Sequence, residues 1–231
     1  MAARPKLTAG RMRRSQPTRH EVVRMPSSKP ARPILEFHPL TAERWRDLVT
    51  LFDHHGNPGY CWCMTWRSTS TAYRQLDSAG RRHALESLVK TGAPTGILGY
   101  LNGQPVGWCS IAPRETYLRL ERSTTLKRID DLPTWSVVCF FVSRKARGQG
   151  LALKLLQAAV AYAVEQGAKV IEGYPVDSNK SYRFMGSPAI FKAAGFQDAA
   201  VVENGRRIVR FVIATGRRRS RKGACASQRP K

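Results

Sequence analysis

The 231-residue chain has no long apolar run and few acidic residues, and each of these shortages limits the classes of protein to which it can belong. No segment approaches the roughly 20 consecutive apolar residues that a membrane-spanning helix needs, and the N-terminus lacks the apolar core of a signal peptide. We therefore expect a cytoplasmic protein without a membrane partner. The five cysteines are an odd number, and two of them, Cys109 and Cys139, lie in apolar runs, so reduced thiols are expected.

Acidic residues are scarcest at the two ends of the chain. There are 39 Lys and Arg against 16 Asp and Glu, which gives a net charge of +23. Residues 1–33 hold nine of the basic residues with Glu21 as their one acid, and residues 217–231 hold seven with none. Both ends are also poor in large apolar side chains, so we expect disordered arms around one domain, residues 34–216. Basic arms of this kind can contact nucleic acid without sequence specificity, although most charge runs are simply solvated. Met25 is an alternative start of the chain.

Hydrophobic periodicity divides the domain into strands and helices without internal repeats. Asn102-Gly103 is the strongest short hairpin signal, and a helix-sized crossover between residues 135–142 and 169–172 implies a parallel strand pair. Residues 61–67 are ambiguous, and residues 114–132 are expected as helix or loop. The predicted strands are 34–37, 96–101, 105–112, 135–142, 169–172, 200–203 and 206–213, and the predicted helices are 42–53, 78–90, 150–166 and a short one that starts at 187–188 and stops at 195.

The most informative segment is Arg147-Gly148-Gln149-Gly150-Leu151-Ala152, which follows an apolar strand and opens a helix. Glycine at 148 and 150 removes side chains where a helix begins, so several free backbone N–H groups can converge on an anion. The spacing is neither that of a dinucleotide-binding loop, because Leu stands at 153, nor that of a P-loop. The alternative to anion binding is that the loop is only a tight turn between strand and helix. Arg147 would add charge beside the anion, and the alternative is that it is an ordinary exposed loop arginine.

The R-x-x-G-x-A pattern at Arg147, Gly150 and Ala152 resembles motif A of the GCN5-related N-acetyltransferases (GNAT). The resemblance runs from about Ile34 to Ile213, and the C-W-C-M segment at Cys61–Met64 is similar to an uncharacterised bacterial branch. It implies an α/β fold, with a mixed, mostly antiparallel sheet and a central parallel strand pair flanked by helices. It also implies acetyl-CoA as cosubstrate, with its pyrophosphate on residues 147–152 and its pantetheine arm along the backbone of Phe140, Phe141 and Val142.

The resemblance also shows a departure. The general acid of many family members is a tyrosine four residues before a Gly-Phe pair, and that position is Phe191 here. Tyr174, Tyr182 and Ser187 are nearby substitutes, with Tyr182 preferred because it lies in the long turn before that helix. The pantetheine-contacting asparagine of the family is replaced by Phe184, and Asn179 is a displaced candidate.

Acetyl transfer to an amine also needs a base, because a free alkyl amine has a pKa of about 10.4. Glu172, at the end of a strand, is the candidate base, with a solvated strand-end carboxylate as the alternative. Asp130 and Asp131 either attract a cationic amine or cap a turn. Cys139 suggests an acyl-cysteine route, but a thiol in an apolar strand is usually inert packing.

His54, His55, Cys61 and Cys63 have the side chains of a zinc site but not its usual ligand spacing, so no metal is expected. Trp62 and Trp66 suit either the core or a pocket wall, and with the resemblance we expect this stretch to line the acceptor pocket. The predicted function is acetyl transfer from acetyl-CoA to a primary amine, in a small molecule or a protein, by direct attack in a ternary complex. The alternative is a non-catalytic domain that senses acyl-CoA or docks on nucleic acid.

Overall fold

A mixed β-sheet forms the centre of the computed structural model, which describes residues 33–54, 59–177, 183–202 and 205–213. These residues all belong to one unit that begins at Pro33. The predicted arms, 1–33 and 217–231, lie outside the described residues apart from Pro33 itself. No helix within the described ranges is long and apolar enough to span a membrane.

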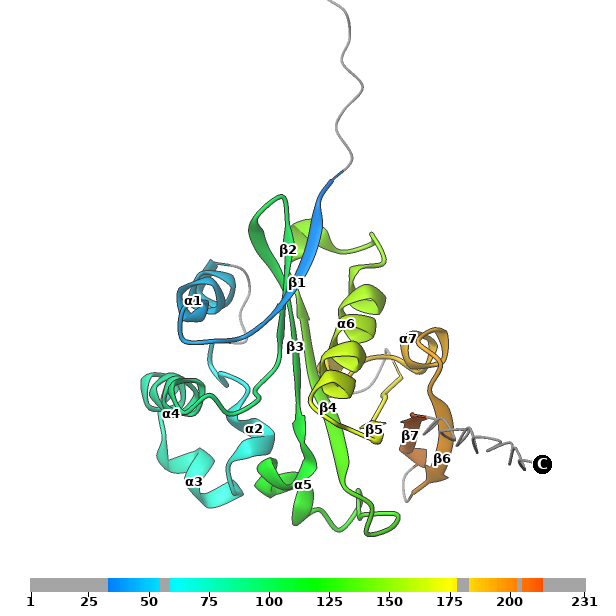
Figure 1. Ribbon diagram of the computed structural model, residues 1–231. Helices are drawn as coiled ribbons and strands as arrows, with labels where there is room; N and C mark the ends of the chain where they lie inside the picture. Colours follow the sequence, from blue (N-terminus) through cyan, green and yellow to red (C-terminus); the bar gives the residue numbers. More distant parts are fainter. Residues whose placement is uncertain (1–32, 55–58, 178–182, 203–204, 214–231) are drawn as a thin grey trace, which may run out of the picture. The chain divides into compact units, whose positions relative to one another are not determined.

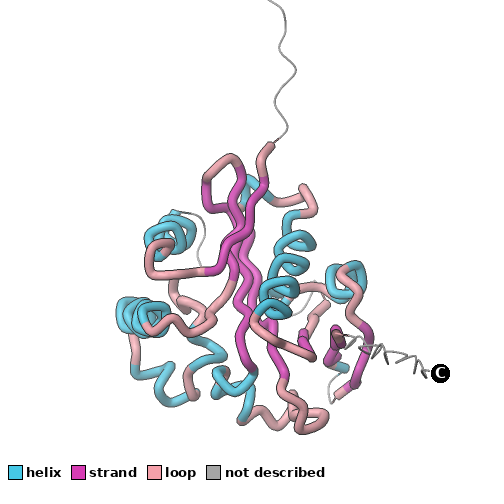
Figure 2. The backbone as a smooth tube through the Cα atoms, viewed as in Figure 1, coloured by secondary structure: helices cyan, strands magenta, loops and turns pink. Residues whose placement is uncertain are grey.

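In the described residues the sheet has the strand order β1-β2-β3-β4-β5-β7-β6 (Figures 1 and 2). Every neighbouring pair is antiparallel except β4 and β5, which are parallel. The predicted fold class is therefore confirmed. The strands are β1 Leu35–Pro39, β2 Ile97–Leu101, β3 Gln104–Pro113, β4 Thr134–Val142, β5 Val170–Gly173, β6 Gln197–Val201 and β7 Arg207–Val212.

Two layers of helices cover the sheet. Helices α6 and α7 lie on one face, and the helices between β1 and β2 lie on the other (Figure 1). Each face has its own apolar core, one around Trp108, Phe52 and Tyr117 and the other around Leu155, Leu156 and Phe191. The helices are α1 Trp45–His54, α2 Met64–Arg67, α3 Ser70–Gln75, α4 Ser78–Lys90, α5 Leu118–Glu121, α6 Leu151–Glu165 and α7 Pro188–Ala193, with 3₁₀ turns η1 Arg114–Thr116, η2 Arg144–Ala146 and η3 Arg183–Met185.

Local signals explain most of these boundaries. The hairpin between β2 and β3 turns at Asn102 and Gly103, whose φ angles of 50° and 76° are both left-handed, as a type I′ turn requires. The α4 helix has the predicted bounds, and the Asp77 carboxylate caps it by accepting a 2.7 Å bond from Gly80 N. Proline at the first position of α7 follows the N-cap Ser187, where a missing N–H costs nothing.

Three predictions of local structure were incomplete. The first helix begins at Trp45 rather than at Ala42. The ambiguous segment 61–67 is a turn followed by the one-turn helix α2. The helix α3 was not predicted, and its N-cap is Thr69, whose hydroxyl accepts a bond from Ala72 N. The strand expected at 200–203 is β6, which begins at Gln197. Helices of four to six residues give too little periodicity to be recognised.

Candidate active site

The central parallel pair separates part of the way along β4. Pairing runs from Thr134 opposite Val170 to Val137 opposite Gly173, where β5 ends, while β4 continues to Val142. The register between β3 and β4 shifts at the same level, between Ser110 and Ile111, and leaves Val138 as an extra residue in β4. An extra residue is a β-bulge, and a bulge bends its strand. Beyond Val137, β4 therefore has no β5 residue opposite it.

Beyond Val137, the side of β4 that faces away from β3 has free main-chain groups, and we call the space next to it, where β5 has ended, the gap. Ser143 N donates to Val106 O at 2.8 Å, which fixes the residues that face β3. Because antiparallel bonding alternates along a strand, Phe140 and Val142 direct their N–H and C=O groups away from β3. Val142 O accepts a 2.9 Å bond from Arg147 Nε, so the side chain of the motif arginine folds back onto the end of β4. Within the predicted segment Phe140–Val142, the N–H and C=O of Phe140 and the N–H of Val142 therefore face away from β3, while Phe141 pairs with β3 and Val142 O is bonded to Arg147.

The glycine-rich loop has the predicted conformation at the start of α6. Gly148 and Gly150 have φ angles of 76° and 69°, and nothing lies within 4 Å of a Cβ built on either. Gly150 is the N-cap and no side chain caps the helix, whose first bond runs from Lys154 N to Gly150 O. The amides at Leu151 and Ala152 therefore precede the hydrogen-bonded ladder. They make no hydrogen bond within the helix and stand beside two residues that have no side chain.

The charges around this loop favour an anion. The first turn of α6 contains no acidic residue. Four basic side chains are exposed on or next to the loop, and they add to the positive end of the helix dipole. These residues are Arg144, Lys145, Arg147 and Lys154.

Phe191, the residue in the place of the family's acid, lies beside the gap between β4 and β5. Its side chain is fully buried, and its ring stands edge-on to the Phe140 ring at 6.0 Å between centroids. A Cβ at Gly173, the last residue of β5, would lie 2.1 Å from the Phe191 ring. The position inferred from the resemblance therefore does lie next to the predicted cofactor strand, but it carries an apolar ring.

Glu172 lies inside a buried cluster of charges rather than at a solvated strand end. It is 1% exposed, and Arg114 Nη1, itself 1% exposed, donates to its Oε2 at 2.9 Å. Tyr174 OH also donates to Oε2, at 2.7 Å, while Arg210 donates to Oε1 through Nε and Nη2. Both oxygens are thus occupied. The solvated alternative was wrong, and the role of Glu172 as a base stays a prediction.

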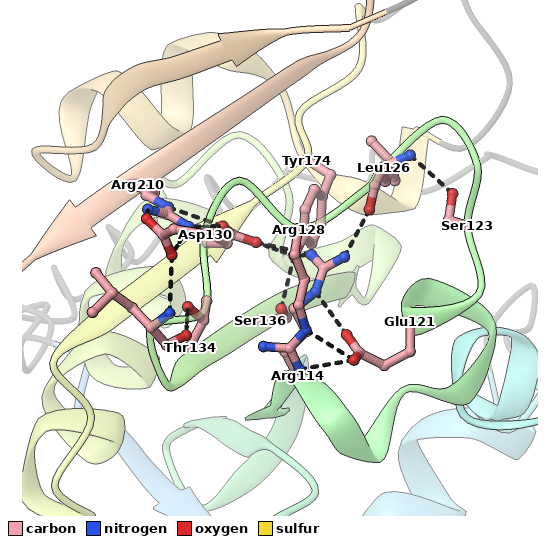
Figure 3. Close-up of polar contacts among 12 residues, drawn as sticks. Arg114, Glu121, Ser123, Leu126, Arg128, Asp130, Thr134, Ser136, Tyr174 and Arg210 are labelled. Atoms are coloured by element: carbon pink, nitrogen blue, oxygen red, sulfur yellow. Dashed lines mark hydrogen bonds and ion pairs between the residues drawn. The ribbon is translucent and has the colours of Figure 1, made fainter.

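The cluster extends through Arg114 and Arg210 to two loops, and Figure 3 shows the contacts of these two arginines there. Arg114 also donates to the Glu121 carboxylate at 2.8 Å and to Leu126 O at 2.7 Å. Arg210 pairs with Asp130, and this pairing lowers the pKa of Asp130. Asp130 also accepts from Leu132 N at 3.1 Å, so it caps a turn as one of the two sequence interpretations proposed. The cluster fastens the segment before β4 to β5 and β7.

The candidate acids have different positions. Tyr174 is fully buried, and burial followed by the Glu172 carboxylate raises its pKa well above the usual value. Its single proton is directed to Glu172, so Ser136, at 2.8 Å from Tyr174 OH, acts as a donor. Ser187 is the N-cap of α7 without a side-chain cap bond. Tyr182 and Asn179 lie outside the described residues, and their proposed roles remain predictions.

The C-W-C-M turn packs into the core. Trp62 is 2% exposed and Trp66 is 8% exposed, and Trp62 contacts the rings of Phe52 and Trp45. Trp108 Nε1 donates to Cys63 Sγ at 3.0 Å, and a hydrogen bond with Cys139 is the main cause that raises the pKa of Cys63. Within the described ranges no three His, Cys, Asp or Glu side chains are placed to hold a metal ion. A role for this turn in lining an acceptor pocket stays a prediction.

Sequence reasoning missed the arginines that surround Glu172. Arg114 directly follows β3, and Arg210 lies inside β7 between apolar residues. A charged residue within an apolar strand pattern was the available signal, because such a residue is rarely buried unless it is paired. The pattern does not indicate the partner, which comes from a strand 38 positions away in the case of Arg210.

A split parallel pair, a free β4 edge and an uncapped, glycine-rich helix start define a nucleotide- or cofactor-binding α/β domain. The model of the acetyltransferase (GNAT) family matches residues 51–185, which is more than half of the chain. The chain belongs to this family. The matched region extends from α1 to η3 and so contains the whole split and the glycine-rich loop.

Solved structures with low sequence identity resemble the chain in part. One is the aminoglycoside acetyltransferase AAC(6′)-Ib in complex with coenzyme A, with 14% identity, 78% of this chain and 95% of that chain covered, and a TM-score of 0.48. Another is the PaiA N-acetyltransferase of Thermoplasma acidophilum in complex with coenzyme A. It has 11% identity, 78% of this chain and 99% of that chain are covered, and the TM-score is 0.46. A third is YncA, a putative acetyltransferase from Salmonella typhimurium with acetyl-CoA. It has 16% identity, 77% of this chain and 93% of that chain are covered, and the TM-score is 0.45. No curated protein matches the chain.

Proposed function

We propose that the protein is an N-acetyltransferase that moves the acetyl group of acetyl-CoA to a primary amine. The observation that carries the proposal is the start of α6, where uncapped amides, two left-handed glycines and open space occur together. Membership of the GNAT family agrees with it. Aminoglycosides are acceptors of one structural relative by its title, but small amines, amino acids and protein amines all remain candidates here.

The donor would be held at two places. The amides of residues 148–152 bind the pyrophosphate, with Arg147 close by, and the main chain of Phe140–Val142 bonds to the pantetheine arm as an added strand would. Asn179 is the proposed side-chain contact to that arm. The loop and the strand end are joined by the bond from Arg147 Nε to Val142 O, so one extended molecule can contact both places.

The reaction is a direct attack of the neutral amine on the thioester carbonyl, with release of the thiol. Most of the rate then comes from holding the two reactants together and from stabilising the oxyanion. We propose Tyr182 as the acid that protonates the departing thiolate, since Phe191 has no proton to give. Glu172 is the proposed base, although its two arginine partners make a positioning role the competing explanation.

Calorimetry with acetyl-CoA tests the donor site directly. We expect a dissociation constant below 1 mM, and we expect Gly148→Asp to weaken it at least about tenfold, since one charge-assisted contact is lost and a like charge is added. Gly92→Asp is the matched control, because Gly92 has a φ of 75° and equally open surroundings but lies at the end of α4. Absence of binding heat and of a thermal shift would reject the proposal.

A second candidate function is a sensor that binds acyl-CoA without transferring the acyl group. The buried Phe191 ring at the position of the acid favours it. Release of free thiol across a mixed panel of amines separates the two functions, since a sensor binds acetyl-CoA and releases none. The basic arms are a further proposed contact to nucleic acid, and a salt-dependent shift lost on trimming both arms would support it.

A further inference from the structure

Arg67, the last residue of α2, is buried without an acidic partner. Its side chain is 5% exposed. Nη2 donates to Thr95 O at 3.0 Å and to Tyr117 OH at 3.3 Å, Nη1 donates to Thr116 Oγ1 at 3.3 Å, and the guanidinium lies 4.5 Å from the centre of the Tyr117 ring. All of these partners are neutral. Within the part of the chain that the structure describes, no carboxylate forms an ion pair with Arg67.

Arg114 shows what a balanced buried arginine looks like in the same molecule. It is buried to a similar degree, but two carboxylates, Glu121 and Glu172, lie within 2.9 Å of its guanidinium. Burying a charge costs several kcal/mol unless it is paired. The contrast indicates that the partner of Arg67 is a group outside this chain's described residues.

Two orphaned polar atoms occur in the same place. Arg67 Nε and Thr95 Oγ1 are both buried and have no hydrogen-bond partner among the described residues, and Thr95 is 1% exposed. Thr95 O binds Arg67 and lies 3.4 Å from Ser110 Oγ, so both residues belong to one polar cluster. Orphaned buried groups are rare in folded proteins. A water molecule would satisfy the donors but leave the charge unbalanced, whereas a carboxylate does both.

The cluster lies at the level of the split between β4 and β5. Ser110, whose hydroxyl is 3.2 Å from Tyr117 OH, pairs in register with Cys139, the residue after the bulge at Val138. Tyr117 belongs to the core on the face opposite α6, so the guanidinium is on that face and one strand away from β4. A carboxylate bound to Arg67 would place the rest of its molecule beside the gap.

The elements that hold Arg67 and its partner Tyr117 are short. Arg67 ends the one-turn helix α2, and Tyr117 precedes the equally short α5. Arg119 of α5 donates to Thr65 O at 3.5 Å and, like Arg67, forms no ion pair among the described residues. Single-turn helices open locally at low cost, so an anion can reach Arg67 when they open, and two guanidinium groups without an ion-pair partner attract it.

We propose that Arg67, assisted by Thr95, binds a carboxylate of the acceptor. The substrate class is then an amine that also carries a carboxylate, such as an amino acid or a peptide end. This inference rests on the proposed acetyltransferase function and adds its acceptor class.

The test compares amines that differ only by a carboxylate, namely lysine with cadaverine and 4-aminobutyrate with butylamine. Thiol release from acetyl-CoA should show a kcat/KM about 10- to 100-fold higher for the carboxylated member, the usual effect of one charge-assisted bond. Arg67→Met should abolish that preference, Arg67→Lys should keep part of it, and Arg74→Met, on the exposed side of α3, should leave it unchanged. Turnover without a preference, or a preference that survives Arg67→Met, overturns the inference while acetyl transfer stands.

A thermal-shift experiment tests carboxylate binding at Arg67 without relying on turnover. At constant ionic strength lysine and 4-aminobutyrate should raise the Tm of the wild type but not that of Arg67→Met, and cadaverine and butylamine should raise neither. No shift with any carboxylate overturns the inference. Loss of acetyl-CoA binding in calorimetry is a separate result that rejects the proposed function, so the two failures are distinguishable.

Discussion

Arg114 and Glu172 form an ion pair that is closed off from water, with 2.9 Å between Nη1 and Oε2 and 1% exposure on either side chain. Their attraction has to compensate the loss of hydration of two charges, and it does so only with the help of the surrounding hydrogen bonds. Removing either member leaves the other as an uncompensated charge inside the fold.

Arg114→Met and Glu172→Gln should therefore each lower the free energy of unfolding by about 3–5 kcal/mol, measured by urea denaturation. Asp198→Asn is the control, because Asp198 and Arg207 are 58% and 49% exposed and such a pair contributes less than about 1 kcal/mol. Equal losses for the buried and the exposed pair would show that the cluster is not structural.

Glu172→Gln also separates the two roles of this carboxylate. With Glu172 as the proposed base, we expect the variant to lose the rising limb of the pH profile of kcat/KM. The profile is measured with acetyl-CoA and a responsive amine at a temperature where both proteins are folded. A rising limb that is kept, with a change in kcat that follows the loss of folded protein, would instead assign Glu172 a positioning role, since two arginines and a tyrosine occupy its oxygens.

Gly173 permits the close approach of Phe191. A Cβ at this position would lie 2.1 Å from the ring, so Gly173→Ala should cost about 1–3 kcal/mol of stability through overpacking. Gly107→Ala is the matched control, since its Cβ would make only ordinary contacts at 3.4 Å or more. Gly173→Ala combined with Phe191→Leu should recover part of the loss. Unfolding curves of the four proteins measure this, and a tolerated alanine at 173 would contradict it.

Tyr117 should make the fold sensitive to alkaline pH. Burial raises the pKa of Tyr117 to about 12 from its usual 10.0, although the Arg67 guanidinium opposes the shift. Between these two values the unfolded chain loses the phenol proton and the folded chain keeps it. Stability therefore falls as pH rises through this window, by up to about 1.4 kcal/mol per pH unit.

Tyr117→Phe should consequently show a shallower decline of unfolding free energy from pH 10 upward than the wild type. Denaturant unfolding at closely spaced pH values measures the slope. If the unfolding free energy of the variant declined as steeply with pH as that of the wild type, the prediction would be wrong, because the folded phenol would then ionise like an unfolded one.

Asp130 gives the opposite dependence at acidic pH. Arg210 lowers its pKa below the usual 3.8, so its stabilisation is complete above that value and is lost as pH falls through the lowered folded pKa. Asp130→Asn should be less stable than the wild type at neutral pH and should lose less on acidification. Tm measurements below pH 5 at low salt test this, and parallel curves for the two proteins would count against it.

The elements that the sequence predicted well are those whose signals are local. Asn102-Gly103 turns a hairpin because both positions adopt left-handed φ, and Gly148 and Gly150 open α6 for the same reason. The unbroken apolar run of β4 predicted a strand covered on both faces, and its inner residues are buried. The family resemblance rests chiefly on the β4 run and the glycine-rich loop that follows it.

The amino-acid sequence by itself determined most of the strands, the parallel pair and the loop at the start of α6, because turn chemistry and apolar periodicity act over a few neighbouring residues. Only the tertiary structure decided the surroundings of Glu172, Phe191 and Arg67. Glu172 meets Arg114 from 58 positions away, and Arg67 meets Tyr117 from 50. Whether a charge is paired, or an oxygen is free to act as a base, depends on such distant contacts, and residue spacing along the chain carries no record of them.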